Sequence, residues 1–161
     1  FVPINLRMSR TMPHILIVDA PYYTHISNAL LAGAEEALKA AGATWERVTV
    51  PGVLEVPAAV SMALEGMSRG NTHYDGFVTL GCVIRGETSH DAWINGAVAH
   101  ELAAMSSRHG RPAAFGVITC NDIDQARARA GGDRGDKGIE SMDAAIAAVR
   151  TAASIRAGAD A

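Results

Sequence analysis

A short, continuously apolar segment that ends in a polar loop constrains the fold of this chain more than any other feature. The segment runs from Gly76 to Ile84, is rich in β-branched residues, and leads into a polar stretch that ends at His90. An apolar run of this length without alternation is typical of a parallel strand covered on both faces. A helix is expected from about Asp91, and its positive end, next to the backbone N–H groups of residues 86–88, favours an anionic group such as phosphate.

Strand and helix patterns alternate along the rest of the chain. Strand-like segments are expected at residues 14–18, 45–50, 76–84 and 112–119. Helices are expected at 26–41, at 57–69, from 91, from Asn121 or Asp122 to Ala130, and after a glycine-rich loop at 131–138. The segment 45–50 is the least apolar, which favours a place at the sheet edge. The alternation predicts an α/β fold, a four-stranded parallel sheet with helices on both faces.

Composition limits both the number of domains and the class of partner. With 161 residues, 48% of them hydrophobic, the chain suits one domain, expected over 14–158 after an irregular arm or tag at 1–13. The net charge of −3 and the pI near 6.1 give no reason to expect nucleic acid or a membrane as partner. No stretch resembles a membrane span or a secretion signal, so a cytoplasmic location is expected. Cys82 and Cys120 lack a metal-ligand spacing and are interpreted as reduced core residues.

Four segments, in order along the chain, carry a family resemblance. They are V-P-G-V-L-E-V-P at 50–57, V-I-R-G-E-T-S-H at 83–90, F-G-V-I-T at 115–119, and the arginine- and lysine-bearing stretch at 125–138. At this spacing the chain resembles the lumazine synthase family of riboflavin biosynthesis, and the resemblance extends over about 14–152. It implies a flavodoxin-like three-layer sandwich with strand order 2-1-3-4. It also implies condensation of 5-amino-6-(D-ribitylamino)uracil with 3,4-dihydroxy-2-butanone 4-phosphate, without metal or organic cofactor.

The resemblance assigns the pyrimidine and its ribityl chain to residues at the carboxyl ends of the strands, where open parallel sheets bind ligands. The residues concerned are Tyr22, Val53, Leu54, Glu55, Cys82, Val83, Ile84, Phe115 and Lys137. Tyr22 is expected to stack on the pyrimidine, with Tyr23 as a possible rival. Glu55 would accept bonds from ribityl hydroxyls, although a first-turn acid is also favoured by the helix dipole. Phe115 is either a contact to the substrate ring or plain core.

The phosphate of the second substrate is assigned to Glu87, Thr88 and Arg129. Glu87 would contribute its N–H, because a carboxylate facing phosphate would repel it. Arg129 can grip phosphate through paired hydrogen bonds, whereas Arg127 and Arg134 are competing arginines expected on the solvated surface. A lysine common in the family's loop is replaced here by an aspartate at position 133, which weakens the local positive field.

His90 is assigned as the proton shuttle, because each step of the implied reaction moves protons and a histidine titrates near neutrality. Asp91 follows directly, where the family more often has an aromatic residue and then an acid. It would orient His90 or cap the helix, and we favour the cap. The other five histidines are expected to be structural or exposed: His14, His25, His73, His100 and His109.

The resemblance also implies an assembly with active sites between subunits. A pentamer is expected, with a larger shell left open. Tyr22, Glu55 and His90 would come from one subunit, and Phe115, Arg129 and Lys137 from its neighbour. A non-catalytic lumazine- or flavin-binding paralogue and an assembly scaffold are the alternative functions; retention of Arg129 and Thr88 argues against the first.

Overall fold

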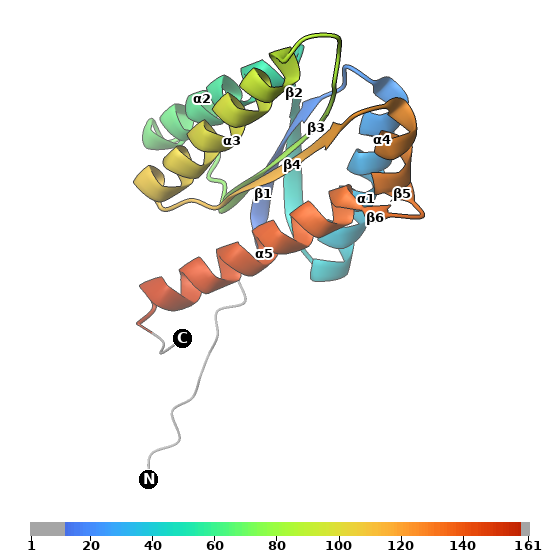
Figure 1. Ribbon diagram of the computed structural model, residues 1–161. Coiled ribbons are helices and arrows are strands. Elements are labelled where there is room, and N and C mark those ends of the chain that lie inside the picture. Colours follow the sequence, from blue (N-terminus) through green and yellow to red (C-terminus); the bar gives the residue numbers. More distant parts are fainter. Residues whose placement is uncertain (1–11, 159–161) are drawn as a thin grey trace.

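The structure, a computed structural model, describes residues 12–158 and contains a four-stranded parallel sheet in the order β2-β1-β3-β4 (Figure 1). The strands are β1 (His14–Ala20), β2 (Thr44–Thr49), β3 (Gly76–Ile84) and β4 (Ala113–Cys120). The predicted fold class and the strand order implied by the resemblance are both confirmed. Most of the N-terminal segment predicted to be an irregular arm, residues 1–11, lies outside the described residues.

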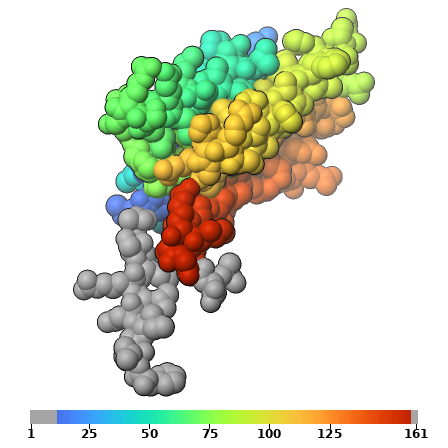
Figure 2. Space-filling view, turned by 90° about the vertical axis from the view of Figure 1, so that its left-hand side faces the viewer, coloured from blue at the N-terminus to red at the C-terminus, as the bar shows by residue number. Residues whose placement is uncertain are grey.

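Helices cover both faces of this sheet, as predicted (Figure 1). They are α1 (Thr24–Ala41), α2 (Val56–Ser68), α3 (His90–His109), α4 (Ile123–Arg129) and α5 (Lys137–Arg156). On one face, α1 and α5 pack over Ile15 and Ile17 in a core cluster. On the other, α2 and α3 pack over Leu16 and Val18. Figure 2 faces this second layer, where α2 (green) and α3 (yellow) lie side by side.

The strand β3 is buried along most of its length because it lies between β1 and β4 and is covered from both sides. Its apolar, β-branched sequence matches that environment. In contrast, β2 pairs only with β1 and exposes most of its side chains, so the predicted edge position is confirmed. All four strands point the same way, which brings their carboxyl ends to one edge of the sheet.

The glycine-rich stretch predicted to be a loop at 131–138 is structured differently. It forms a small antiparallel hairpin, β5 (Ala130–Gly132) with β6 (Gly135–Asp136), and α5 already begins at Lys137. Gly131 and Gly135 have φ angles of 89° and 90°, which glycine adopts without steric cost and which let so short a hairpin form. Asp122 caps α4 through a bond from the N–H of Gln125, as one of the two predicted caps.

Candidate active site

A cavity of about 490 Å³ lies at the carboxyl ends of the strands, and we call it the strand-end cavity. Its lining comprises Tyr22, Tyr23, Gly52, Val53, Leu54, Glu55, Cys82, Val83, Ile84, Gly86, Thr88, His90, Asp91 and Ile94. Segments far apart in the sequence therefore meet here: the loop after β1, the segment after β2, the end of β3 and the start of α3. This is the place where open parallel sheets bind ligands.

The segment after β2 forms one wall of the cavity. Val53 begins a single 3-10 turn, Val53–Glu55, and its side chain is only 6% exposed because it inserts into the core. The insertion needs a glycine at position 81, since a Cβ there would lie 2.9 Å from Cγ2 of Val53. With Val53 fixed inward, Leu54 and Glu55 are exposed at the cavity, and Pro57 stands in the first turn of α2.

The loop after β3 and the first turn of α3 form the opposite side. The N–H of Arg85 donates to the carbonyl of Cys120 at 2.8 Å, which extends the pairing with β4 one residue beyond the end of β3. Residues 85–90 are exposed. The helix α3 begins at His90, with Ser89 at the N-cap position and no side-chain cap bond. The prediction that Asp91 caps this helix is therefore wrong: Asp91 lies inside the first turn, where an acid interacts favourably with the helix dipole.

Two tyrosines flank the cavity, and their environments differ. Their rings meet edge to face with centroids 5.1 Å apart. Tyr22 is 73% exposed, whereas Tyr23 packs partly against the core, where burial raises the pKa of its phenol. Tyr22 therefore has an open ring face available for stacking on a planar ligand, and Tyr23 supports it from behind.

Cys82 contributes an apolar, uncharged part of the cavity. Its side chain is 3% exposed, and burial, with a smaller contribution from nearby Cys120, raises its pKa to about 12. A thiol with such a pKa stays protonated at neutral pH and is a poor nucleophile. Both cysteines are buried and unbridged, so their predicted place in the core is confirmed.

Four predicted site residues do not line the strand-end cavity: Glu87, Phe115, Arg129 and Lys137. Glu87 is exposed on the loop before α3, and Phe115 is 37% exposed on β4. The ammonium group of Lys137 pairs with Glu140 in the first turn of α5.

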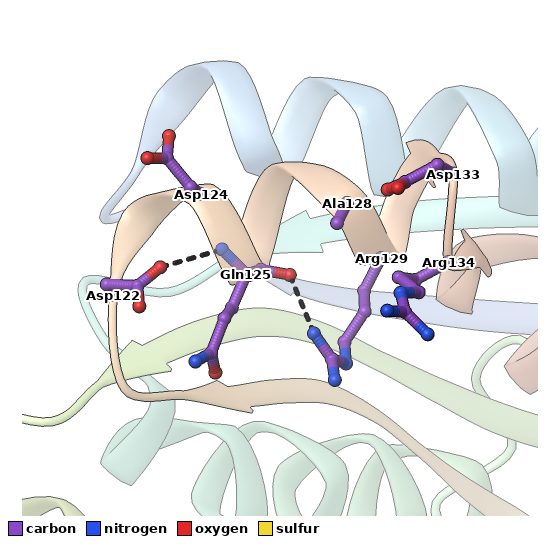
Figure 3. A pocket seen from close by; sticks show the side chains of 7 residues that line it. All are labelled: Asp122, Asp124, Gln125, Ala128, Arg129, Asp133 and Arg134. Atoms are coloured by element: carbon purple, nitrogen blue, oxygen red, sulfur yellow. Dashed lines mark hydrogen bonds between the residues drawn. The ribbon is translucent and has the colours of Figure 1, made fainter.

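Arg129 lies in a second hollow of about 680 Å³, the α4 cavity (Figure 3). Its lining comprises Asp122, Asp124, Gln125, Ala128, Arg129, Asp133 and Arg134. Nη1 of Arg129 donates to the carbonyl of Gln125 at 3.1 Å, so the guanidinium is held at the end of α4. Arg127 pairs instead with Asp124 at 2.9 Å on the surface, in agreement with the role expected for it.

Sequence reasoning missed some of the lining of the strand-end cavity, in particular Gly52 and Ile94, whereas Gly86 was expected there as part of the anion-binding loop. Ile94 lies one helical turn after His90 on α3, and that i, i+4 spacing could have identified it. No such signal existed for Gly52, whose place depends on how the segment after β2 folds.

Two further features of the described residues concern metal ions and membranes. Within residues 12–158, no group of three or more His, Cys, Asp or Glu side chains is arranged to hold a metal ion. No helix in that same range has the length and apolar character needed to cross a membrane.

Comparison with known proteins gives a consistent result. Residues 12–153 match the family described as 6,7-dimethyl-8-ribityllumazine synthase. 6,7-Dimethyl-8-ribityllumazine synthase 1 of Rhizobium meliloti is 46% identical over 140 residues, which cover 86% of this chain and 92% of that protein. The enzyme of the same name from Agrobacterium fabrum is 44% identical over 134 residues, covering 83% and 90%. That of Methylocella silvestris is 44% identical over 134 residues, covering 83% and 82%. The chain therefore belongs to the 6,7-dimethyl-8-ribityllumazine synthase family, enzymes of riboflavin biosynthesis.

Proposed function

We propose that the strand-end cavity is the site where this chain condenses 5-amino-6-(D-ribitylamino)uracil with 3,4-dihydroxy-2-butanone 4-phosphate to form 6,7-dimethyl-8-ribityllumazine. The observation that carries the proposal is that nine of the thirteen residues named from the family resemblance line one cavity. The matched relatives are all named as synthases, which does not favour a non-catalytic paralogue or a scaffold.

The pyrimidine substrate fits the apolar and backbone-rich part of this cavity. Tyr22 stacks on the planar ring, and the backbone at the end of β3, Cys82 to Ile84, contacts its edge. The turn Val53–Glu55 follows the ribityl chain, where the exposed carboxylate of Glu55 accepts hydrogen bonds from hydroxyl groups. This part of the site recognises a flat ring with a polyol tail.

The phosphate of the second substrate binds, in this proposal, at the loop before α3. There the N–H groups of Glu87 and Thr88 and the positive end of a long helix favour an anion. His90, at the first position of that helix, stands beside both substrates. It moves protons as the amine adds to the ketone, water leaves to give an imine, phosphate is eliminated, and the second ring closes with loss of water. Holding the two substrates in register supplies much of the remaining rate acceleration.

A phosphate is bound more tightly where an arginine or lysine also contacts it, and this consideration supports a site shared between subunits. Among the described residues, the lining of the strand-end cavity includes no lysine or arginine. Arg129 and Lys137 lie elsewhere on the same chain. In a cyclic pentamer the contact is head-to-tail, so Arg129, Lys137 and Phe115 of one subunit complete the cavity of the next. We place this assembly in the cytoplasm.

A turnover assay with the two substrates tests the function. Formation of the lumazine product and of one phosphate per turnover is expected, whereas binding without turnover contradicts an enzymatic role.

The shared site has a separate test that uses two inactive variants. His90→Ala and Arg129→Ala proteins are unfolded together and reassembled, so that some interfaces pair an intact His90 with an intact Arg129. Recovery of activity is expected. If verified mixed rings stay as inactive as each variant alone, both residues belong to the same subunit's site or to none.

A further inference from the structure

Asp19 is a buried charged residue to which the proposed mechanism gives no part. It lies in β1 between two apolar residues and is 0% exposed. The other buried polar side chains in the described chain are hydroxyls, of Ser27, Thr79 and Ser141, and each donates to a backbone carbonyl. Oδ2 of Asp19 accepts a hydrogen bond from Nη2 of Arg47, while Oδ1 is buried and has no hydrogen-bond partner among residues 12–158.

A buried carboxylate with only one of its two oxygens hydrogen-bonded is not an efficient way to stabilise a fold. Burial raises the pKa of Asp19, and the Arg47 guanidinium opposes the rise without cancelling it. Replacing a buried ion pair with apolar residues of similar size is often neutral or stabilising, because the desolvation cost of the charges disappears. The pair is therefore weak evidence for a role in stability, and its position in the fold indicates a different role.

Asp19 joins two walls of the strand-end cavity. Its side chain holds Arg47 on the edge strand β2, reaching diagonally across the register in which Ile17 is paired with Arg47. Its carbonyl accepts the N–H of Val50 at 2.9 Å, at the point where the chain leaves β2 to form the wall at 50–55. On its own strand, Ala20 follows directly, and its carbonyl accepts the N–H of Tyr22 at 3.0 Å.

The other side-chain contacts of the edge strand lie in its first half, where Glu46 meets Tyr74 and His14. The strand pairs with β1 on one side only, and most of its side chains are exposed. The ion pair with Asp19 lies farther along β2, and the side chain of Arg47 is 39% exposed. A small shift of β2 would carry the wall at 50–55 with it.

We infer that Asp19 and Arg47 are positioning residues: their ion pair fixes the end of β2 and so sets the wall at 50–55 against Tyr22 for the pyrimidine substrate. The inference rests on the proposed function of the strand-end cavity. The phosphate loop at 86–88 follows β3, on the other side of β1, and does not depend on this pair.

The double variant Asp19→Leu/Arg47→Met tests the inference, because it removes both charges and keeps most of the volume. We expect it to unfold at a urea concentration no lower than the wild type. The KM for the pyrimidine substrate should rise about ten- to a hundredfold, as expected for a misplaced binding wall, while the KM for the butanone phosphate stays within about twofold. Arg69→Met, which breaks the exposed ion pair of Arg69 with Glu65 on α2, is the matched control and should change neither.

Hydrogen exchange of the assembled protein provides a readout independent of turnover. The peptide that contains Val50 should exchange faster in the double variant, whereas a peptide from β3 should be unchanged. Arg47→Lys keeps the charge but loses the planar fork, so it should give a smaller KM change in the same direction. If the double variant fails to fold, the KM values of Arg47→Lys test the inference in its place.

The inference is overturned by a wild-type KM for the pyrimidine substrate in the folded double variant, or in Arg47→Lys if only that variant folds. Equal rises in both KM values would also overturn it, because they would indicate a general loss of structure. A wild-type protein without turnover would defeat the proposed function, and unchanged exchange at Val50 would then defeat the inference separately.

Discussion

Replacing Gly138 with alanine should separate two helices and destabilise the fold. Gly138 lies in the first turn of α5, where the chain passes very close to α1: a Cβ at this position would lie 2.0 Å from the carbonyl oxygen of Leu30. Ordinary van der Waals contact begins at 3.4 Å, so the backbones would have to move apart by about 1.4 Å. Because both atoms that clash belong to backbone or Cβ, no side-chain rotation can relieve the contact.

The magnitude follows from two opposing effects. Forcing extra atoms into a well-packed site costs about 1–3 kcal/mol, and this clash belongs at the upper end. Alanine regains up to about 1 kcal/mol of helix propensity relative to glycine. The net expectation is a loss of about 2 kcal/mol, which for a domain of this size lowers Tm by about 4–8 °C.

Gly96→Ala is the matched control. Gly96 lies in the interior of α3, and a Cβ there has no atom within 4 Å. The same substitution should therefore raise stability by about 0.5–1 kcal/mol. Urea unfolding and thermal scans at one fixed protein concentration measure both variants, since assembly makes Tm concentration-dependent. A Gly138→Ala protein as stable as the wild type would refute the close approach of α1 and α5.

Three further predictions concern residues in or beside the site. His90→Ala should lower turnover by about ten- to a thousandfold with assembly intact, because one proton-transfer group is lost while the proximity of the two substrates remains. His100→Ala, on the exposed side of α3, is the control and should not lower turnover, and an unchanged kcat in His90→Ala would remove His90 from the mechanism. Arg129→Ala should weaken binding of the butanone phosphate by about 2–3 kcal/mol and binding of the pyrimidine substrate much less, with Arg127→Ala as the control. Equal weakening of binding for both substrates in a titration contradicts the assignment. Burial raises the pKa of Asp19 in the folded protein above its ordinary value of 3.8. The contribution of Asp19 to the free energy of unfolding is therefore fully present below pH 3.8 and is lost as the pH rises through the pKa of the folded state. The urea midpoint of the wild type should therefore fall relative to that of Asp19→Asn as the pH rises above 4, and the opposite trend would show that Arg47 dominates.

The sequence predicted the elements of the fold well because hydrophobic periodicity is a local property. The apolar run of β3 identified a strand covered on both faces, and the mixed sequence of β2 identified an edge strand. Both conclusions depend only on how apolar the strand's own side chains are, because that decides how much of the strand can be covered by other elements. The motifs at the strand ends likewise identified most of the cavity lining, because parallel strands bring their carboxyl ends to one edge.

Local errors arose where backbone geometry competes with composition. The glycines between Ala130 and Asp136 indicated a loop, but two of them adopt positive φ and allow a hairpin. Asp91 had the residue type of a cap, but α3 begins one residue earlier and Ser89 occupies the cap position. Element boundaries of this kind depend on one or two dihedral angles, which composition does not fix.

By itself, the sequence determined the order of strands and helices, the edge position of β2, and the set of residues that meet at the strand ends. Only the tertiary structure decided which of two adjacent tyrosines presents an open ring, that Asp19 is fully buried with Arg47 as its partner, and that Arg129 lies outside the cavity it was assigned to. The physical reason is the range of the interactions. Periodicity acts over one turn or one strand, whereas burial, ion pairing and the gathering of a site depend on segments brought together from distant parts of the chain.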